Sequence, residues 1–267
     1  MRTITAGLGA GALALLAASP AGAAEPTFRF TTGFDYSSGD FGETVPTEVL
    51  YVPFTGRATF GRWTFRATVP YLEISGPANV VVGDEGGGGE TTGAPGRGPR
   101  RTVAGLGDTT LAATYSFNRL RGTRAYLDLS GRLRLPTGDE DTGLGVGAVD
   151  TGVNSELGWD GPKGGAYLNL GRRFLGDSDR FKREDGWTAS TGGWVNATRR
   201  VQVGSYYSWR EASLRNGTDP QELGAYFAYR FSRQWRVQLT GYKGLSDGSP
   251  DVGAAVSISF RPRRANR

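Results

Sequence analysis

The feature that most constrains this chain is an alternation of apolar and polar residues, which recurs in segments of about ten residues from Ala24 onward. Tight turns and longer polar loops separate these segments alternately. Because successive side chains of a β-strand point to opposite faces, each segment has one apolar and one polar face. This pattern is typical of transmembrane β-barrels, whose short turns face the periplasm and whose long loops face outward.

We therefore predict an all-β fold, a closed antiparallel transmembrane barrel of about twelve strands. The apolar faces are clearest in five strands, with the outward residues Phe28, Phe30, Thr32, Phe34, Tyr36; Trp63, Phe65, Ala67, Val69, Tyr71; Ala125, Leu127, Leu129, Leu133, Leu135; Leu223, Ala225, Phe227, Tyr229, Phe231; and Val252, Ala254, Val256, Ile258, Phe260. The other seven strands are expected near 49–60, 108–117, 149–159, 166–173, 187–197, 201–209 and 235–242. A soluble β-sandwich also alternates, but an apolar face on every strand and aromatics at strand ends favour the barrel.

The first 23 residues have the features of a secretory signal peptide. Arg2 supplies a basic start, residues 4–16 form an apolar run, and Ala21-Gly22-Ala23 provides a small-residue cleavage site. The apolar run is shorter than the roughly 20 residues that a transmembrane helix needs. We expect residues 1–23 to be removed and residues 24–267 to form the barrel in the outer membrane of a Gram-negative cell.

Composition agrees with a barrel and excludes several kinds of enzyme. Only 37% of the residues are hydrophobic, which suits strands with one wet face. The chain has no cysteine and no histidine, so it has no Ser-His or Cys-His nucleophile pair and no histidine metal site. We predict no enzymatic activity, no cofactor and no metal. The net charge of +5 is not concentrated on one helix, so no nucleic-acid partner is expected.

Two further patterns concern the loops. The short turns and the C-terminal tail are mostly basic, whereas the longer loops are mostly acidic. The longest loop, residues 76–104, contains four consecutive glycines and several prolines. Two interpretations of this loop stay open: an irregular surface loop, or a loop that folds inward and narrows a pore.

The polar faces of the strands predict the residues that line the pore. Arginines outnumber acids in this set, and tyrosines recur in it. The predicted pore-lining residues are Arg57, Arg66, Tyr126, Asp128, Arg132, Arg134, Asp150, Glu156, Tyr167, Tyr206, Glu222, Tyr226, Arg230 and Arg236. Such charges either pair off and rigidify a small barrel or form a polar track that selects solutes. The arginine excess favours anions, and the tyrosines favour stacking of apolar or aromatic solutes.

The last strand, residues 251–260, resembles the C-terminal signal that the barrel-assembly machinery reads, with Gly253 followed by alternating apolar residues and Phe260. The chain departs from that signal in carrying seven more residues, 261–267. The expected partners are this machinery during insertion, outer-membrane lipid and lipopolysaccharide, and a small-molecule solute. A closed barrel has no free edge, so a monomer is expected.

Three glycine-rich joints carry a family resemblance: Gly105-Leu106-Gly107-Asp108 before a strand, Leu135-Pro136-Thr137-Gly138-Asp139 after one, and residues 143–150. From about residue 105 to residue 260, the chain resembles the outer-membrane transporters grouped as the MetA-pathway of phenol degradation family. The resemblance implies a barrel that passes hydrophobic or aromatic compounds, and it assigns no functional residues.

Three hypotheses about function follow. The first is a channel for passive uptake of small molecules, in particular aromatic or hydrophobic compounds. The second is an arginine-lined porin for anions or acidic oligosaccharides. The third is a structural or surface-interaction barrel with a plugged lumen.

Overall fold

The structure is a computed structural model. It describes residues 25–41, 45–76, 80–82, 89–91, 100–117, 123–178, 182–215 and 217–263, with the backbone alone at 80–82 and 89–91. The signal peptide expected at residues 1–23 lies outside the described residues and stays a prediction. Most of the loop expected at 76–104 lies outside them as well.

Fifteen strands form in the described part of the chain. They are β1 (Thr27–Gly39), β2 (Thr47–Phe60), β3 (Trp63–Gly76), β4 (Val80–Val82), β5 (Gly89–Thr91), β6 (Arg101–Leu106), β7 (Thr109–Phe117), β8 (Ala125–Leu135), β9 (Asp150–Asp160), β10 (Gly164–Phe174), β11 (Gly186–Val195), β12 (Val201–Arg210), β13 (Gln221–Arg230), β14 (Trp235–Gly244) and β15 (Val252–Phe260). No helix among the described residues is long and apolar enough to cross a membrane.

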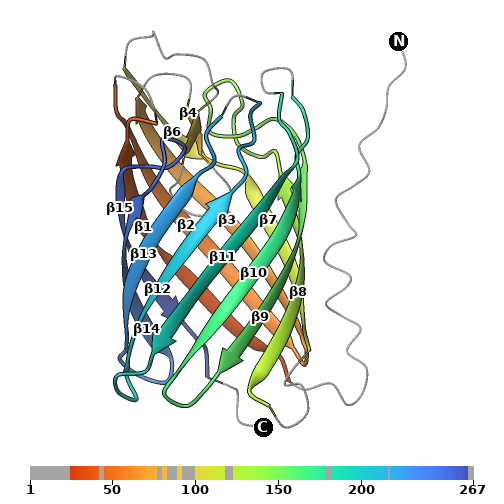
Figure 1. The fold of residues 1–267 in the computed structure, drawn as a ribbon, viewed down its shortest axis with the longest axis vertical. Coiled ribbons are helices and arrows are strands. Elements are labelled where there is room, and N and C mark those ends of the chain that lie inside the picture. The colour runs from red at the N-terminus through yellow and green to blue at the C-terminus, as the bar shows by residue number, and fades with distance from the viewer. Residues whose placement is uncertain are drawn as a thin grey trace, which may run out of the picture.

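Thirteen of these strands close into one antiparallel barrel, and β4 and β5 form a separate two-stranded sheet. From β7 to β15 each strand pairs with its neighbours in the chain, β1 pairs with β15, and the pairing of β2 with both β1 and β3 completes the ring. Both β6 and β7 pair with β3, so they act as one interrupted strand and the barrel has twelve strands. Figure 1 shows the strands strongly tilted against the long axis of the barrel, with β4 and β6 at one end and the C-terminus at the other.

A β-bulge separates β6 from β7. On β3, two residues lie between the register positions of Thr68 and Tyr71, whereas three residues lie between their partners Thr110 and Leu106. The amide of Gly107 donates a hydrogen bond to the carbonyl of Pro70, at 2.9 Å, and keeps the bulge attached to the wall. A bulge redirects the side chain that follows it, and here that side chain is Asp108.

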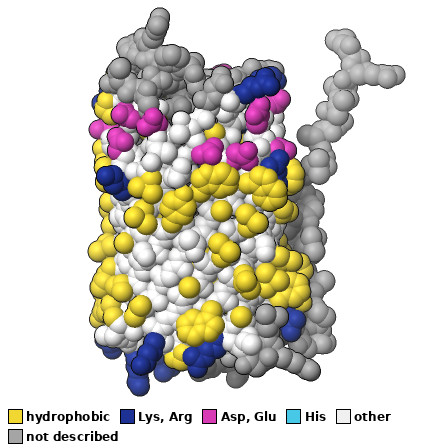
Figure 2. All heavy atoms as spheres, in the orientation of Figure 1, with side chains coloured by type: hydrophobic (Ala, Val, Ile, Leu, Met, Phe, Trp, Pro, Cys, Tyr) yellow, Lys and Arg dark blue, Asp and Glu magenta, His cyan; other side chains and the backbone are white. Residues whose placement is uncertain are grey.

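The outer face of the barrel is apolar, as predicted for a surface in contact with lipid. Large side chains such as Phe30, Phe65, Leu129, Leu168 and Ile258 are exposed on it. Aromatic rings pack against each other near the short turns: the ring centroids of Trp63 and Tyr115 are 5.0 Å apart in a T-shaped pair, and those of Trp235 and Phe260 are 4.6 Å apart in a tilted pair. On the face that Figure 2 shows, hydrophobic side chains cover the body of the barrel, basic ones gather at the lower end, and acidic ones lie toward the upper end, with some basic ones beside them. Aromatic rings at a membrane interface and basic periplasmic turns agree with this orientation.

The strand prediction is confirmed with small shifts at the ends. All twelve predicted strands are present, and the outward sets are on the outer face. The main difference lies in the loop expected at 76–104, because β6 already begins at Arg101. Residues 71–76 of β3 pair with β6 through the backbone, so the wall extends further than the alternation of apolar residues in the sequence indicated.

Candidate functional site

The polar faces of the strands surround a cavity of about 760 Å³ inside the barrel. Hydroxyl, amide and charged side chains dominate its wall, which is the composition expected for a water-filled lumen. The residues that border it are Arg29, Thr31, Tyr51, Pro53, Thr55, Arg57, Arg66, Thr68, Thr110, Ala112, Thr114, Ser130, Arg132, Asn154, Glu156, Tyr167, Asn169, Thr188, Ala189, Ser190, Ser208, Trp209, Arg210, Pro220 and Glu222.

A row of hydroxyl groups runs across neighbouring strands of this wall. Ser259, Thr31, Thr55 and Thr68 follow one another in the backbone register from β15 through β1 and β2 to β3. The hydroxyls of Thr31 and Ser259 are 2.9 Å apart, as are those of Thr55 and Thr68. Hydroxyls that bond to each other along the wall keep a smooth polar surface and leave the lumen open.

Five inward-facing tyrosines lie against the wall because each is opposite a glycine on an adjacent strand. A Cβ atom added at Gly224 would lie 2.3 Å from the ring of Tyr206, and one added at Gly253 would lie 2.1 Å from the ring of Tyr242. The pairs in register are Tyr126 with Gly158, Tyr167 with Gly192, Tyr206 with Gly224, Tyr226 with Gly204 and Tyr242 with Gly253. Glycine supplies the space that a ring needs to lie flat on a neighbouring strand.

Two of these tyrosines are also hydrogen-bonded to carboxylates. The hydroxyl of Tyr126 donates to Oε1 of Glu156 at 2.8 Å, and that of Tyr242 donates to Oδ1 of Asp35 at 2.7 Å. A carboxylate that accepts such a bond is held on the wall at a fixed position. The tyrosines therefore shape the lumen and orient part of its negative charge.

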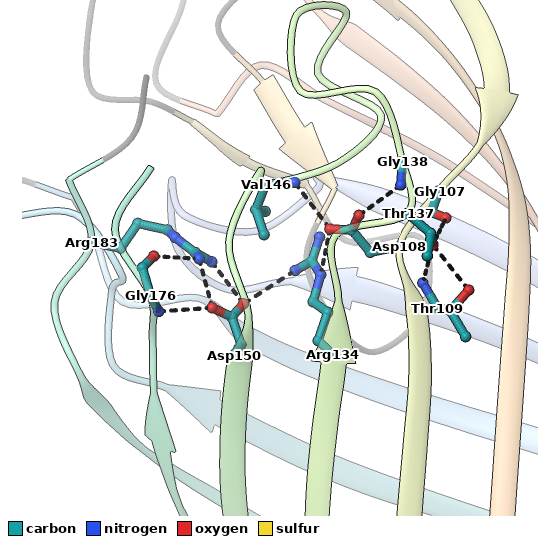
Figure 3. Close-up of polar contacts among 10 residues, drawn as sticks. All are labelled: Gly107, Asp108, Thr109, Arg134, Thr137, Gly138, Val146, Asp150, Gly176 and Arg183. Atoms are coloured by element: carbon teal, nitrogen blue, oxygen red, sulfur yellow. Dashed lines mark hydrogen bonds and ion pairs between the residues drawn. The ribbon is translucent and has the colours of Figure 1, made fainter. Parts of the chain in front are cut away.

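At the extracellular rim, four charged side chains form a buried network (Figure 3). Arg134 Nε lies 2.9 Å from Oδ2 of Asp108, and its Nη1 lies 3.9 Å from Oδ2 of Asp150. Arg183 binds Asp150 with two nitrogens, at 2.8 and 2.6 Å. The four side chains are each at most 9% exposed. Buried charges require this kind of pairing, so the network ties β7, β8, β9 and the segment after β10 together.

The Asp108 carboxylate also holds the loop between β8 and β9. It accepts a hydrogen bond from the amide of Gly138 and another from the amide of Val146, both at 2.9 Å. Thr137 closes the same corner, because its hydroxyl donates to the carbonyl of Gly107 at 3.1 Å. The two ends of the loop are therefore fixed to one carboxylate in the bulge of the wall.

This loop, residues 136–149, folds inward over the barrel wall. Leu144 at its centre is buried against Val49, Leu72 and Ile74, which lie on the inner faces of β2 and β3. Gly105 makes room for it, since a Cβ atom there would lie 2.9 Å from Leu144 Cδ1. The inward loop thus narrows the extracellular end of the lumen on the side of β2 and β3.

Comparison with known proteins agrees with these features. Residues 30–261 match the model of a family described as "Putative MetA-pathway of phenol degradation". The chain belongs to this family. A search of the curated proteins found no sequence that matches.

Two solved structures are similar in fold to this chain. One is the COG4313 outer-membrane channel of Pseudomonas putida F1, with a TM-score of 0.67 and 14% identity over 92% of this chain and 100% of the other. The other is the KdgM porin, with a TM-score of 0.53 and 7% identity over 87% of this chain and 99% of the other. The protein therefore has the fold of outer-membrane channels of Gram-negative bacteria.

The joints that suggested the family have a physical role in this structure. Gly105, Gly107 and Asp108 make the bulge and the space beside it, and Thr137 and Gly138 close the corner opposite. The motifs thus build the rim network and its inward loop. Both interpretations of loop 76–104, a surface loop or an inward fold, concern residues that lie largely outside those described, and the loop that folds inward in the structure is 136–149.

The predicted pore-lining residues fall into three groups. Those that border the main cavity are Arg57, Arg66, Arg132, Glu156, Tyr167 and Glu222. Those on the inner wall that bond to or pair with a neighbouring strand are Tyr126, Asp128, Tyr206, Tyr226, Arg230 and Arg236. Arg134 and Asp150 also face inward, but they border a separate cavity of about 40 Å³ and are buried in the rim network. Their charges therefore stabilise the rim. Their burial does not favour a direct role in lining the main pore.

Several residues of the site were missing from the prediction, among them Arg29, Arg183 and Leu144. Arg29 stands between the outward Phe28 and Phe30, so alternation already placed it inward and could have found it. Arg183 and Leu144 lie in loops, where no periodicity indicates the direction of a side chain. Only their contacts in the folded barrel assign them to the rim.

Proposed function

We propose that this protein is a passive outer-membrane channel for small molecules, with aromatic compounds among its solutes. The observation that supports this most directly is the cavity of about 760 Å³ within a closed barrel. A volume of this size accommodates a small organic molecule. A filled or plugged lumen, the structural alternative, would not leave such a space.

Aromatic solutes are favoured by the surfaces that lead into the cavity. Tyr51 packs against the apolar cluster of Leu144 and also borders the cavity. Tyr167, on β10, borders the cavity from the opposite wall. A solute thus passes from an apolar patch at the rim to aromatic rings inside, and rings stack favourably on other rings. The family description, which refers to phenol degradation, points to the same class of compound.

Conduction of anions is the second candidate, because arginines are frequent on the wall. Arg29, Arg57, Arg66, Arg132 and Arg210 all border the cavity. Rings of cationic side chains favour anions in pores. The two functions are compatible, since a polar lumen can carry ions and still bind an aromatic ring on its tyrosines.

Conductance of the refolded protein in planar bilayers tests the proposal, with its fold first verified by a β-sheet circular dichroism spectrum. We expect steady channels under a salt gradient. Adding benzyl alcohol should interrupt the current briefly, more often than cyclohexylmethanol, which has a similar size and no aromatic ring. Folded protein that carries no current would contradict an open channel and favour a plugged barrel. Equal interruption by both alcohols would contradict a preference for aromatic solutes.

We further propose that the protein works as a monomer inserted by the barrel-assembly machinery among outer-membrane lipids and lipopolysaccharide. The closed ring of strands supports this, because apart from β6, which pairs with β3 alone, the barrel strands are paired on both sides. Cross-linking in outer-membrane vesicles tests it, and a dominant dimer or trimer band would contradict it.

A further inference from the structure

Three arginines stand side by side on the inner wall of the barrel. In the backbone register, Arg29 of β1 lies opposite Arg57 of β2, and Arg57 lies opposite Arg66 of β3. All three side chains border the main cavity. They lie near the periplasmic ends of their strands, beyond the row of hydroxyls that lines the middle of the wall.

The charges of these three arginines are available to a ligand. Their side chains are exposed to the lumen, and no carboxylate of the described residues forms an ion pair with any of them. Asp128 on β8 attracts Arg57 from across the wall without forming such a pair. In the rim network, by contrast, Arg134 and Arg183 are buried and bound to carboxylates.

The arrangement is unfavourable unless an anion is present. Like charges directly opposite each other on neighbouring strands destabilise a sheet, and here this juxtaposition occurs twice in succession. The adjacent row of hydroxyls shows that this wall can be polar without repeated positive charge. A bound anion relieves the repulsion, and two or three guanidinium groups can donate to it together.

The row also extends toward the extracellular end. Arg66 lies opposite Ala112, Ala112 opposite Arg132, and Arg132 opposite Gly152, whose partner on β10 is Arg173. Because the strands are tilted, a row across them climbs along the barrel (Figure 1). It therefore joins the periplasmic arginines to Arg132, which borders both the large and the small cavity.

We propose that Arg29, Arg57 and Arg66 form an anion-binding site that takes the carboxylate of a small organic acid on its way through the lumen. The planar guanidinium group matches a carboxylate with two parallel hydrogen bonds. The cavity is large enough for an organic body behind that carboxylate, and Tyr167 offers it a ring on the opposite wall. The inference names the solute class of the channel and so rests on the proposed function.

Equilibrium binding tests the site without requiring permeation. Benzoate would be titrated by calorimetry into the refolded protein in detergent micelles, next to benzyl alcohol and inorganic phosphate. We expect benzoate to bind more tightly than either. The double variant R57Q/R66Q should weaken benzoate binding by about tenfold to a hundredfold, as loss of charge-assisted hydrogen bonds does. Benzyl alcohol binding should not change.

Matched controls separate the site from the net charge. R62Q/R200Q removes two arginines from periplasmic turns outside the cavity and should leave benzoate binding unchanged. R57K/R66K keeps the charge but loses the planar guanidinium group, so its affinity for benzoate should lie between those of the wild type and R57Q/R66Q. Equal loss in R62Q/R200Q and R57Q/R66Q, or benzoate binding that R57Q/R66Q leaves intact, would overturn the site. Phosphate that binds as tightly as benzoate would overturn the assignment to organic acids.

Ion selectivity gives a second measurement on the same variants. The reversal potential under a salt gradient should indicate anion preference in the wild type and shift toward zero in R57Q/R66Q. Conduction with no arginine-dependent benzoate binding would refute the site and leave the channel standing. Arginine-dependent benzoate binding in a protein that never conducts would refute the channel and leave the site standing.

Discussion

At the scale of single residues, Asp108 connects the barrel wall to the loop that folds inward. Its carboxylate binds Arg134 and accepts two backbone hydrogen bonds from the loop that folds inward. Placed by a bulge and almost fully buried, it has no water to replace a lost partner. The shape of the extracellular end therefore depends on one ionised side chain.

Replacing Asp108 by Asn should loosen the rim. The amide keeps the shape of the side chain but removes the charge that balances Arg134, and breaking a buried ion pair costs about 3–5 kcal/mol. We expect a lower urea midpoint of unfolding and a noisier, larger conductance as loop 136–149 moves. Asp139→Asn, at an exposed position of the same loop, should change neither. An unchanged midpoint in Asp108→Asn would contradict the role of this charge.

Leu144 is the apolar counterpart of Asp108, because it fixes the centre of the loop against the inner wall. Truncation to Ala should cost about 2–5 kcal/mol at a fully packed site. We expect Leu144→Ala to release the loop and raise single-channel conductance. Leu245→Ala, at an exposed leucine of another extracellular loop, serves as the control. Equal conductance of the wild type and Leu144→Ala would show that the loop does not narrow the entrance.

At the scale of strands, glycines decide how wide the lumen is. Five inward tyrosines each lie against a glycine of an adjacent strand, so their rings cover the wall and leave the lumen axis free. Glycine weakens a strand when it stands alone, and here the packed ring replaces the contacts that its missing side chain would make. Strand composition and pore width are thus linked through cross-strand pairs.

Gly224→Val should therefore narrow the pore. A side chain there would meet the ring of Tyr206 and push it toward the lumen axis. We expect a measurable fall in single-channel conductance with the barrel still folded. Gly241→Val, on a neighbouring strand where an added Cβ meets nothing within 4 Å, is the matched control. A conductance that falls equally in both variants would argue for a general loss of strand stability.

At the scale of the whole molecule, alternate residues of each strand face lipid on the outside of the barrel and water in its lumen. Leu168 is exposed on the outer face of β10, and Asn169 next to it borders the cavity. In lipid every backbone polar group needs a partner within the protein, and the closed sheet provides it. The two faces of one strand therefore tolerate opposite substitutions.

Leu168→Arg should destabilise the barrel by about 2–4 kcal/mol, as expected for arginine on the lipid face near the bilayer midplane. Asn169→Arg should cost far less, because its charge stays in the wet lumen, and it should instead increase anion selectivity. Urea titration in lipid vesicles measures the first effect and the reversal potential the second. Similar destabilisation of both variants would mean that the assignment of inner and outer faces is wrong.

The sequence alone determined the architecture and the two faces of the wall. Alternation with period two is a local property, so it is visible without any contact between strands. It predicted twelve strands, the lipid-facing sets and the inward direction of Arg57, Arg66, Tyr167 and Glu222. The glycine-rich joints around Asp108 indicated the family for the same reason, since they lie close together along the chain.

Only the tertiary structure decided which inward residues meet. Period two fixes the face of a residue but not its register with the next strand, and the closed set of strand pairings fixes that register. Three features are therefore visible only in the fold. They are the row from Arg29 to Arg66, the pairs of tyrosine and glycine, and the ion pair between Arg183 and Asp150, which are 33 positions apart in the sequence. Loop 136–149 belongs to the same class, because the position of Leu144 depends on inner-wall residues contributed by β2 and β3.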